Sequence, residues 1–395
     1  MRILLVSTQD YIHHPVPSRH HYIFEELAKR HEVHVPHFHV SEGKERETRL
    51  IVHEATKYPF KNPALHYLFN APHHYKVIKG LIEEEEIDAV VASHVLAGTA
   101  AVKAAKKCGV PTIFDLKDWF PDSAASYYKN PVLKWTLRNG VWQITKYNLG
   151  MSDQITTVSP SLVERLNDRG FDAKLITNGV NTDYFKPMDS VLGKRRLGLD
   201  EDDFVIGFSG SVERWYALDQ VIKSFAKISE GEGDLRLLVV GGSLFTDYDQ
   251  ELEKLTKKLG IEDKVVFSGL VEYEELPSYI SAMDLCLIPL LPDDWVDIAL
   301  PNKFFEYSAC GKPILSTPIP DMIKIGGENL FIYRDMKEFS DKVLEIKNSP
   351  RSFEVDMTNY SWKRKAREME TIIANLVAGK NRRPQQIYIE DMGRH

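Results

Sequence analysis

The sequence predicts an α/β protein made of two similar halves, each a doubly wound parallel sheet covered by helices. Short β-branched runs alternate with turns and helical segments along most of the chain, which is typical of parallel sheets with helical crossovers. This alternation restarts after Pro187–Leu199, a polar stretch rich in Gly, Pro and charge. A chain of 395 residues is also too long for one hydrophobic core. We therefore expect two domains that face a cleft.

The first half contains six short apolar runs that read as strands. Helices are expected between them at His20–Arg30, Ala97–Lys107 and Pro160–Arg169. Pro160 would stand in the first helical turn, where its missing N–H costs no hydrogen bond. The expected strands are Arg2–Ser7, Glu32–Phe38, Asp88–Ser93, Thr112–Leu116, Gln154–Val158 and Lys174–Thr177.

The second half repeats this arrangement and ends with a long helix. We expect a first domain over 1–187, a second over 188–360, a helix over 361–378 that returns to the first domain, and a polar tail over 379–395. The expected strands are Phe204–Ser209, Leu235–Val240, Lys264–Ser268, Leu285–Leu290 and Pro313–Ser316, and the expected helices are Leu218–Ser229, Tyr248–Leu259, Leu276–Ala282 and Asn302–Ala309.

The charge of the chain argues against a nucleic-acid partner. The net charge is −7, and the acidic excess lies in the second half while the first is near neutral. Nucleic-acid binding needs a concentrated basic face. The N-terminal segment reaches polar residues too early for a secretory signal, and no apolar run approaches the length of a membrane span. We expect a cytoplasmic protein, with peripheral contact at the inner face of a membrane left open.

Neither the cysteines nor the clustered histidines predict a metal site. The three cysteines are far apart in the sequence, which favours buried free thiols. His13, His14, His20 and His21 lack carboxylate or thiolate neighbours at ligand spacing. No metal and no cofactor are expected. Because the loop Gln9–Arg19 leaves the first strand at its carboxyl end, it is a candidate for acceptor binding.

The most informative segment is residues 300–313, where a helix is expected to begin at the cleft. Pro301 can open a helix, and a helix start offers free backbone N–H groups and a positive dipole end that suit a diphosphate. Lys303 and Glu306 are three residues apart and share one helix face. A cation for phosphate beside a carboxylate for ribose hydroxyls would suit a nucleoside diphosphate. A surface ion pair of little energetic consequence would show the same spacing.

This segment resembles the donor-site signature of family 4 glycosyltransferases, which have the GT-B fold of two Rossmann-like domains. It reads Pro-Asn-Lys-Phe-Phe-Glu-Tyr at 301–307 and Gly-Lys-Pro at 311–313, as in a subgroup similar to bacterial and archaeal cell-surface polysaccharide glycosyltransferases. The resemblance implies that Glu306 binds the nucleotide ribose. It also implies that Pro301, Asn302 and Lys303 lie beside the diphosphate.

The chain departs from this family pattern eight residues before Glu306. Many members carry a glutamate there that approaches the transferred sugar, whereas this chain has Ile298, with Asp297 beside it. Either Asp297 replaces that glutamate or backbone groups hold the sugar.

The loop after the first strand of the second half is a further candidate for diphosphate binding. Ser209 and Gly210 are small enough to let backbone approach a phosphate, and Arg214 could clamp it. In the resemblance this loop usually supplies an Arg and a Lys, but those positions read Ser211 and Tyr216 here.

Two turns are also part of the resemblance. Gly241, which ends the next strand, matches a turn that borders the nucleotide, although a plain tight turn fits equally well. The stretch Thr177–Pro187 resembles an Asn-Gly hallmark near the interdomain hinge. Asn178-Gly179 would serve mainly as a turn there.

Acceptor-side chemistry is expected in the first half, at the ends of two strands. The stretch Thr112–Ser123 places carboxylates and aromatic residues at a strand end, and it resembles a family stretch in which Lys117 and Asp118 occupy the positions of a frequently catalytic His-Asp pair. We favour Asp118 as a polar acceptor contact or base, although it could instead cap the next helix. His94, at the end of the preceding strand, is a second catalytic candidate, with a packing role nearly as plausible.

The resemblance implies transfer of a hexosyl or N-acetylhexosaminyl unit from a UDP- or GDP-sugar to a hydroxyl of a glycan or lipid-linked acceptor, as in polysaccharide biosynthesis for the cell envelope. Retention of anomeric configuration without a metal ion is expected, and the nucleotide-sugar is a substrate rather than a cofactor. Two alternatives stay open: an enzyme similar to UDP-GlcNAc 2-epimerase, and a non-catalytic partner subunit.

Overall fold

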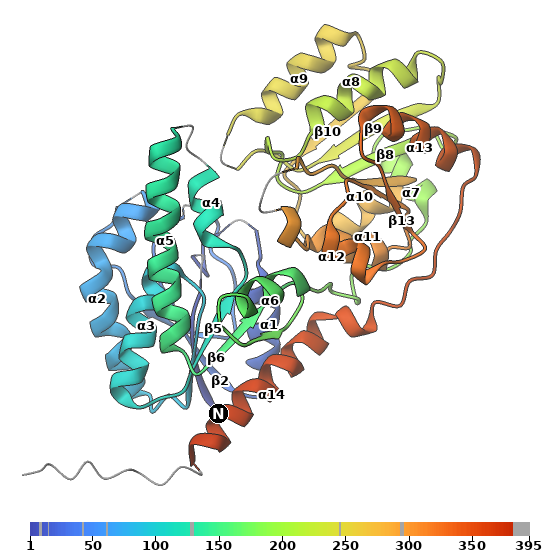
Figure 1. Ribbon diagram of the computed structural model, residues 1–395. Coiled ribbons are helices and arrows are strands. Elements are labelled where there is room, and N and C mark those ends of the chain that lie inside the picture. Colours follow the sequence, from blue (N-terminus) through green and yellow to red (C-terminus); the bar gives the residue numbers. More distant parts are fainter. Residues whose placement is uncertain are drawn as a thin grey trace, which may run out of the picture.

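Two parallel β-sheets, each flanked by helices, make up the molecule (Figure 1). The structure is a computed structural model and describes residues 1–7, 10–14, 16–41, 43–60, 62–126, 130–244, 246–292 and 296–381. Most of the predicted tail therefore lies outside the described residues. No helix in the described part of the chain combines the length and the apolar character that crossing a membrane requires.

The first sheet has seven parallel strands in the order β3-β2-β1-β4-β5-β6-β7. Its central strands are buried, β4 and β5 along their whole length and β1 from Ile3 on, which explains their runs of Ile, Leu, Val and Ala. The strands are β1 (Arg2–Val6), β2 (Glu32–His37), β3 (Ile51–Glu54), β4 (Ala89–Ala92), β5 (Thr112–Leu116), β6 (Gln154–Thr157) and β7 (Ala173–Leu175), and the helices are α1 (Arg19–Leu27), α2 (Pro63–Glu84), α3 (Val95–Cys108), α4 (Phe120–Ser126), α5 (Pro131–Met151) and α6 (Pro160–Asn167).

The second sheet has six parallel strands in the order β10-β9-β8-β11-β12-β13. The strands are β8 (Phe204–Ser209), β9 (Leu235–Val240), β10 (Val265–Gly269), β11 (Leu285–Ile288), β12 (Ile314–Ser316) and β13 (Leu330–Ile332). The helices of this half are α7 (Ser190–Arg196), α8 (Leu218–Ser229), α9 (Tyr248–Leu259), α10 (Leu276–Ala282), α11 (Asn302–Ala309), α12 (Pro320–Ile325) and α13 (Met336–Asn348).

Helix starts follow a repeated local rule. Asn62, Asn130 and Ser159 each accept a backbone N–H of the first turn through the side chain, and a proline follows each of them at the first helical position. The predicted helix start at Pro160 is therefore present.

The two chain crossings between the halves lie side by side. Val180 N donates to Tyr360 O over 2.8 Å, and Trp362 N donates to Val180 O over 3.0 Å. Gly179 is required here, because a Cβ atom would come 2.5 Å from Tyr360 O. The last helix, α14 (Trp362–Asn381), then runs back along the first half and contacts α1 (Figure 1).

The predicted fold class is confirmed, with several elements that the sequence pattern did not predict. The polar stretch Pro187–Leu199 contains α7, which Asp189 caps by accepting from Val191 N. Strand β3 is mostly exposed at the sheet edge, so it lacks a clear apolar run. The domain boundary at 187/188 stays a prediction.

Candidate active site

The first turn of α11 places Lys303 and Glu306 on one buried face at the carboxyl ends of the second sheet. Pro301 precedes the helix with extended backbone, as an N-cap residue must. Lys303 is 7% exposed and Glu306 is 8% exposed. Asn302 adds a buried side-chain oxygen, Oδ1, that has no hydrogen-bond partner among the described residues. Such an oxygen is a ready acceptor for a ligand hydroxyl.

Lys303 has an aromatic rather than an acidic environment. Its Nζ lies 3.7 Å from the ring centre of Tyr216 and 4.5 Å from that of Phe208. These are cation–π contacts, and Nζ makes no ion pair with a carboxylate of the described chain. Burial lowers the pKa of Lys303 to about 7, against the opposing effect of Glu306. An anionic ligand would supply the counter-charge that the protein does not.

Glu306 is the complementary buried group. Burial raises its pKa to about 7 in spite of Lys303 and a hydrogen bond from Tyr273, whose hydroxyl donates to Oε1 over 3.4 Å. Tyr273 and Tyr22 lie with ring centres 5.4 Å apart, and Tyr22 in turn stacks on Trp362 at the start of α14. Aromatic residues thus connect Glu306 with the first half of the molecule.

Two glycine loops form the wall opposite α11. Gly210 has φ +135°, and a Cβ atom on it would come 2.9 Å from Lys303 Nζ. Gly241 has φ +121°, and a Cβ atom there would come 2.0 Å from Gly210 O. Ser209 is held by Tyr307, since its N and Oγ lie 2.8 and 3.0 Å from the Tyr307 hydroxyl. These loops bring backbone close to Lys303, as phosphate binding requires.

Arg214 does not join this group. Its guanidinium donates to Glu251 on α9 over 2.6 Å and lies 4.9 Å from the ring centre of Tyr248. The Arg214 side chain is 60% exposed. The neighbouring Tyr216, at the family's lysine position, instead lies against Lys303.

The two residues that break the family pattern face different surroundings. Ile298 is buried with apolar residues of the first half, and its carbonyl accepts from Ser159 Oγ over 2.9 Å. Asp297 is exposed in a short 3-10 turn, Val296–Ile298. Ile298 therefore joins the two halves, and Asp297 is an exposed carboxylate next to it in the chain.

Asp118 and Lys117 follow β5 at the edge of the first sheet. The Asp118 carboxylate makes no hydrogen bond or ion pair with the described residues, and crowding by protein atoms raises its pKa against the effect of Lys117 although the residue is exposed. Asp115 behaves differently. Burial alone would raise its pKa, but Arg19, His20 and Thr156 together lower it to about 2. Asp115 is therefore a buried structural carboxylate, whereas the Asp118 carboxylate can be reached by a ligand.

His94 serves as the N-cap of α3. Its Nδ1 accepts from Leu96 N and Ala97 N over 3.1 and 3.0 Å, and its ring centre lies 3.8 Å from that of Tyr67, with the two rings tilted. Burial lowers the pKa of His94 to about 3. With Nδ1 engaged, the imidazole is neutral and carries its proton on Nε2. This arrangement suits a hydrogen-bond donor better than a general base.

The clustered histidines of the first half separate in the fold. His20 donates to Asp115, His21 stacks on Tyr11, and His14 contacts the Val16 carbonyl through its ring. His13 instead lies 3.1 Å from His37, measured from Nδ1 to Nε2.

Sequence reasoning missed the aromatic part of the site, namely Tyr22, Phe208 and Tyr273. Tyr273 and Tyr22 are 251 positions apart in the sequence, so no local pattern joins them. Phe208 immediately precedes the Ser-Gly loop that is a candidate for phosphate binding. This position in the sequence could have identified Phe208 as a residue of the site.

Comparison with known proteins assigns both halves to glycosyltransferase families. The profile described as Glycosyltransferase Family 4 matches residues 20–184, and the profile described as Glycosyl transferases group 1 matches residues 203–349. Together they cover most of the chain.

Curated relatives agree at the sequence level. A D-inositol 3-phosphate glycosyltransferase of Stackebrandtia nassauensis is 30% identical over 246 residues, covering 58% of this chain and 53% of that protein. An uncharacterised glycosyltransferase of Methanocaldococcus jannaschii is 28% identical over 182 residues, covering 44% of each. The chain thus spans about half the length of these curated relatives.

Solved structures share the fold over the whole chain. Sucrose-phosphate synthase of Thermosynechococcus elongatus superposes with a TM-score of 0.79 at 17% identity, covering 96% of this chain and 99% of that one. HepE of Anabaena in complex with UDP gives a TM-score of 0.67 at 17% identity, covering 96% and 98%. These matches agree with the two-sheet architecture described above. The chain belongs to the family 4 glycosyltransferases and has the GT-B fold.

Proposed function

We propose that this glycosyltransferase moves a hexosyl or N-acetylhexosaminyl unit from a UDP- or GDP-sugar to a hydroxyl of a glycan or lipid-linked acceptor. Transfer would retain anomeric configuration and would need no metal ion at the diphosphate. We place the reaction in the cytoplasm, at the inner face of a membrane. Structural neighbours that were solved with UDP, UDP-glucose or ADP support a nucleotide-sugar donor.

The observation that carries this proposal is the buried pair Lys303 and Glu306 at the first turn of α11. A diphosphate beside Lys303 and the free N–H groups of the helix start would receive positive charge from both. Glu306, three residues on, would accept hydroxyl groups of the ribose. The unpartnered Asn302 oxygen offers one further acceptor at the same turn.

Departure of the nucleoside diphosphate is the step that these groups would assist. Lys303 and the backbone amides would stabilise the negative charge that develops on the leaving phosphate, without any metal ion. Attack of the acceptor hydroxyl on the same face of the sugar would retain configuration. Asp118 would hold the acceptor hydroxyl, and His94 would donate its Nε2–H to a ligand oxygen.

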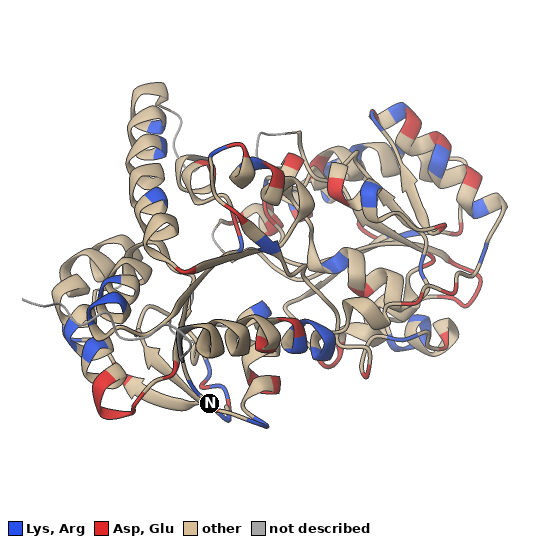
Figure 2. Cartoon of the chain, turned by 60° about the horizontal axis from the view of Figure 1, so that its bottom comes forward, with Lys and Arg blue, Asp and Glu red and all other residues tan. Residues whose placement is uncertain are grey.

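A lipid-linked acceptor is favoured by exposed apolar residues at the starts of α2 and α5. Helix α2 follows strand β3 and therefore begins at the carboxyl edge of the first sheet, where acceptor groups are expected, whereas α5 follows the short helix α4 that comes after β5. Helix α5 carries Lys134, Arg138 and Lys146 but no acidic residue, and Figure 2 shows its basic positions. The apolar residues are Leu65, Leu68, Phe69, Val132, Leu133 and Trp135.

A nucleotide-sugar panel tests the proposal. UDP- and GDP-sugars would be screened by thermal shift and by slow hydrolysis without acceptor. We expect one nucleotide class to raise the melting temperature and to release its sugar. No stabilisation by either UDP or GDP would support a non-catalytic subunit instead. Conversion of UDP-GlcNAc to its 2-epimer without an acceptor would support the epimerase alternative.

The stereochemical part of the proposal needs its own measurement. NMR of the first-formed glycoside, recorded in the presence of EDTA, should show the donor's anomeric configuration. An inverted product would make Asp118 an in-line base and would overturn front-face attack. Loss of transfer with EDTA that Mg²⁺ or Mn²⁺ restores but Zn²⁺ does not would overturn metal independence at the diphosphate.

A further inference from the structure

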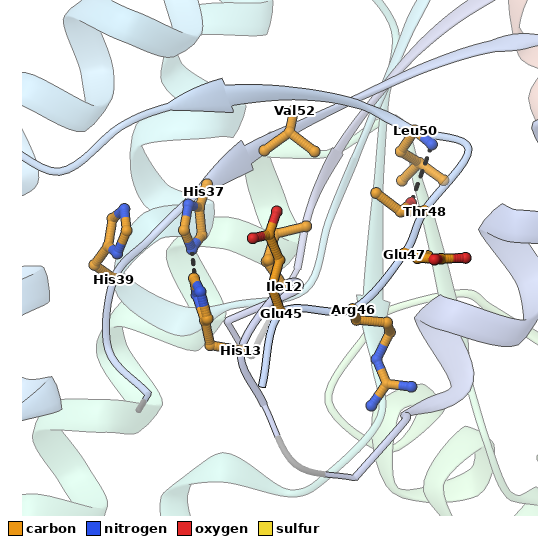
Figure 3. Close-up of a pocket in the computed structure, with 10 residues that line it drawn as sticks. All are labelled: Ile12, His13, His37, His39, Glu45, Arg46, Glu47, Thr48, Leu50 and Val52. Atoms are coloured by element: carbon orange, nitrogen blue, oxygen red, sulfur yellow. Dashed lines mark hydrogen bonds between the residues drawn. The ribbon is translucent and has the colours of Figure 1, made fainter. Parts of the chain in front are cut away.

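Three histidines converge beside a cavity at the carboxyl ends of β1 and β2 (Figure 3). His13 comes from the segment after β1, while His37 ends β2 and His39 follows two residues later. One ring nitrogen from each lies within 4.8 Å of the others. His13 Nδ1 and His37 Nε2 are 3.1 Å apart. Two nitrogens bound to one tetrahedral Zn²⁺ ion at its usual bond length would be separated by about 3.3 Å.

Two carboxylates surround these histidines. Asp10 is 1% exposed and accepts from Ile12 N and His13 N through Oδ1, and from Val40 N and Ser41 N through Oδ2. Its Oδ1 also lies 3.2 Å from His37 Nε2. Asp10 thereby fixes both segments that carry the histidines.

Glu54 on β3 provides the second carboxylate. Its Oε2 lies 2.8 Å from His39 Nε2 and 3.7 Å from His37 Nδ1. Carboxylates that orient imidazole rings from outside are the usual second layer of a metal site.

The surroundings of the three histidines offer open space. The cavity beside the histidines has a volume of about 550 Å³, and Glu45 and Thr48 line its other side (Figure 3). His66 on α2 is fully buried, and neither of its ring nitrogens has a hydrogen-bond partner among the described residues. It is not one of the residues that line the cavity, which is bounded instead by the three histidines and their neighbours.

A second histidine group is a weaker candidate. His34 and His53 lie near Glu85, and His34 Nδ1 is 2.9 Å from His53 Nε2, a contact like that of His13 with His37, but none of these three residues lines the cavity that the first group borders. This second group therefore provides an internal comparison for the first.

We propose that His13, His37 and His39 bind one transition-metal ion of the Zn²⁺ class, with Asp10 holding the backbone segments that carry them, Glu54 orienting the ring of His39, and the fourth coordination position open to the cavity. Three imidazoles and one open position form a donor set that Zn²⁺ accepts. The ion would hold together the segments 10–14 and 37–41, on the acceptor side of the molecule. This site departs from the sequence-based expectation of no metal, and it is separate from the donor diphosphate region at α11.

Metal titration of the untagged full-length chain tests this proposal. After EDTA treatment and dialysis, Zn²⁺ binding would be followed by calorimetry and Co²⁺ binding by visible absorption. We expect one ion per chain, an absorption band typical of low-coordinate Co²⁺, and displacement of Co²⁺ by Zn²⁺. Absence of saturable binding at one ion per chain would overturn the proposal, because the histidines would then contact only one another and the two carboxylates.

Variants assign the binding to these residues. His39→Gln and His13→Gln should each raise the dissociation constant at least about tenfold. Circular dichroism should stay unchanged, because the His39 side chain is 47% exposed and the His13 side chain 22% exposed. His53→Gln, in the second group, is the matched control and should bind Zn²⁺ as the unaltered chain does. Loss of binding in His53→Gln with retention in His39→Gln and His13→Gln would place the metal elsewhere.

Discussion

Lys303 and Glu306 are opposite charges held near each other with little water and without direct contact. Their buried positions shift both pKa values toward about 7, one downward and one upward. Removing both charges from water costs free energy, and no interaction within the free protein fully offsets this cost. A ligand with a diphosphate and a ribose would satisfy both groups, which gives a physical reason for keeping them at a helix start.

Removing the charge of Lys303 should impair donor binding. Lys303→Met keeps the aliphatic stem against Phe208 and Tyr216 but removes the cation. We expect the dissociation constant for the preferred nucleoside diphosphate, measured by calorimetry, to rise at least about tenfold, because a charged hydrogen bond contributes about 1.5–3 kcal/mol.

Arg214→Ala is the control for that experiment. Because Arg214 pairs with Glu251 on the surface, its removal should change the dissociation constant less than about threefold. A larger effect of Arg214→Ala than of Lys303→Met would show that the diphosphate lies nearer α9.

Donor affinity should depend on pH around neutrality. The pKa of Lys303 is lowered to about 7 in the free protein, and a bound diphosphate would favour the protonated amine. Binding therefore takes up a proton above pH 7, and affinity should fall by up to about tenfold per pH unit there. Below pH 7, protonation of Glu306 should weaken ribose binding. Calorimetry from pH 5.5 to 9 should give a maximum near about 7, and Lys303→Met should lose the alkaline fall.

At the scale of elements, backbone approach between loops shapes the donor side. Gly241→Ala would place a Cβ atom 2.0 Å from Gly210 O at φ +121°. Strain of this kind costs about 1–3 kcal/mol at least, and urea unfolding should show a loss of that size. Gly140→Ala on α5 is the matched control, since nothing lies within 4 Å of its Cβ position. It should raise stability by about 0.5–1 kcal/mol. Equal effects of the two substitutions would refute the packing argument.

Buried parallel strands could be predicted from sequence because their signal is local. The strands Phe204–Ser209 and Leu235–Val240 have the predicted bounds, since each is one continuous apolar run closed by turn residues. The helix α13 was missed, although Asp335 caps it and its buried face is regular. The segment 187–199 reads as a linker by composition, and α7 forms there because it packs on α10.

At the scale of the whole molecule, polar contacts join the two halves beside the site. Asp321 on α12 is fully buried and accepts from Ser161 N and Ser161 Oγ at the start of α6, with the Oγ contact at 2.7 Å. Asn178 donates to Leu300 O just before the donor helix. Contacts of this kind span more than a hundred residues of sequence, so composition and periodicity could not predict them.

Removing the Asp321 contact should loosen the arrangement of the halves. In Asp321→Ala, the Ser161 amide and hydroxyl lose their acceptor, at a cost of about 1–3 kcal/mol. Small-angle scattering should show a larger radius of gyration, while the sheets keep their circular dichroism. Lys324→Ala is the control, because it removes from the same helix only an exposed ion pair with Glu164 of α6, which contributes little, and it should leave the scattering unchanged. An unaltered radius of gyration in Asp321→Ala would show that other contacts are enough to hold the two halves in place.

Several features of the site could not be predicted from the sequence and are visible only in the folded structure. The sequence motif placed Lys303 and Glu306 on one helix face, and that placement is present. The contact of Lys303 with Tyr216 and the link from Glu306 to Tyr273 depend on loops brought together by the second sheet. The pairing of Arg214 with Glu251 likewise depends on how α9 packs, which spacing alone does not reveal.

A crystal structure with bound UDP or GDP, whichever stabilises the protein more, tests the donor site most directly. We predict that the diphosphate lies at the first turn of α11, within hydrogen-bond distance of Lys303 Nζ and the helix-start amides, with ribose hydroxyls on Glu306. A nucleotide bound elsewhere, with Lys303 and Glu306 left without ligand contacts, would contradict this account.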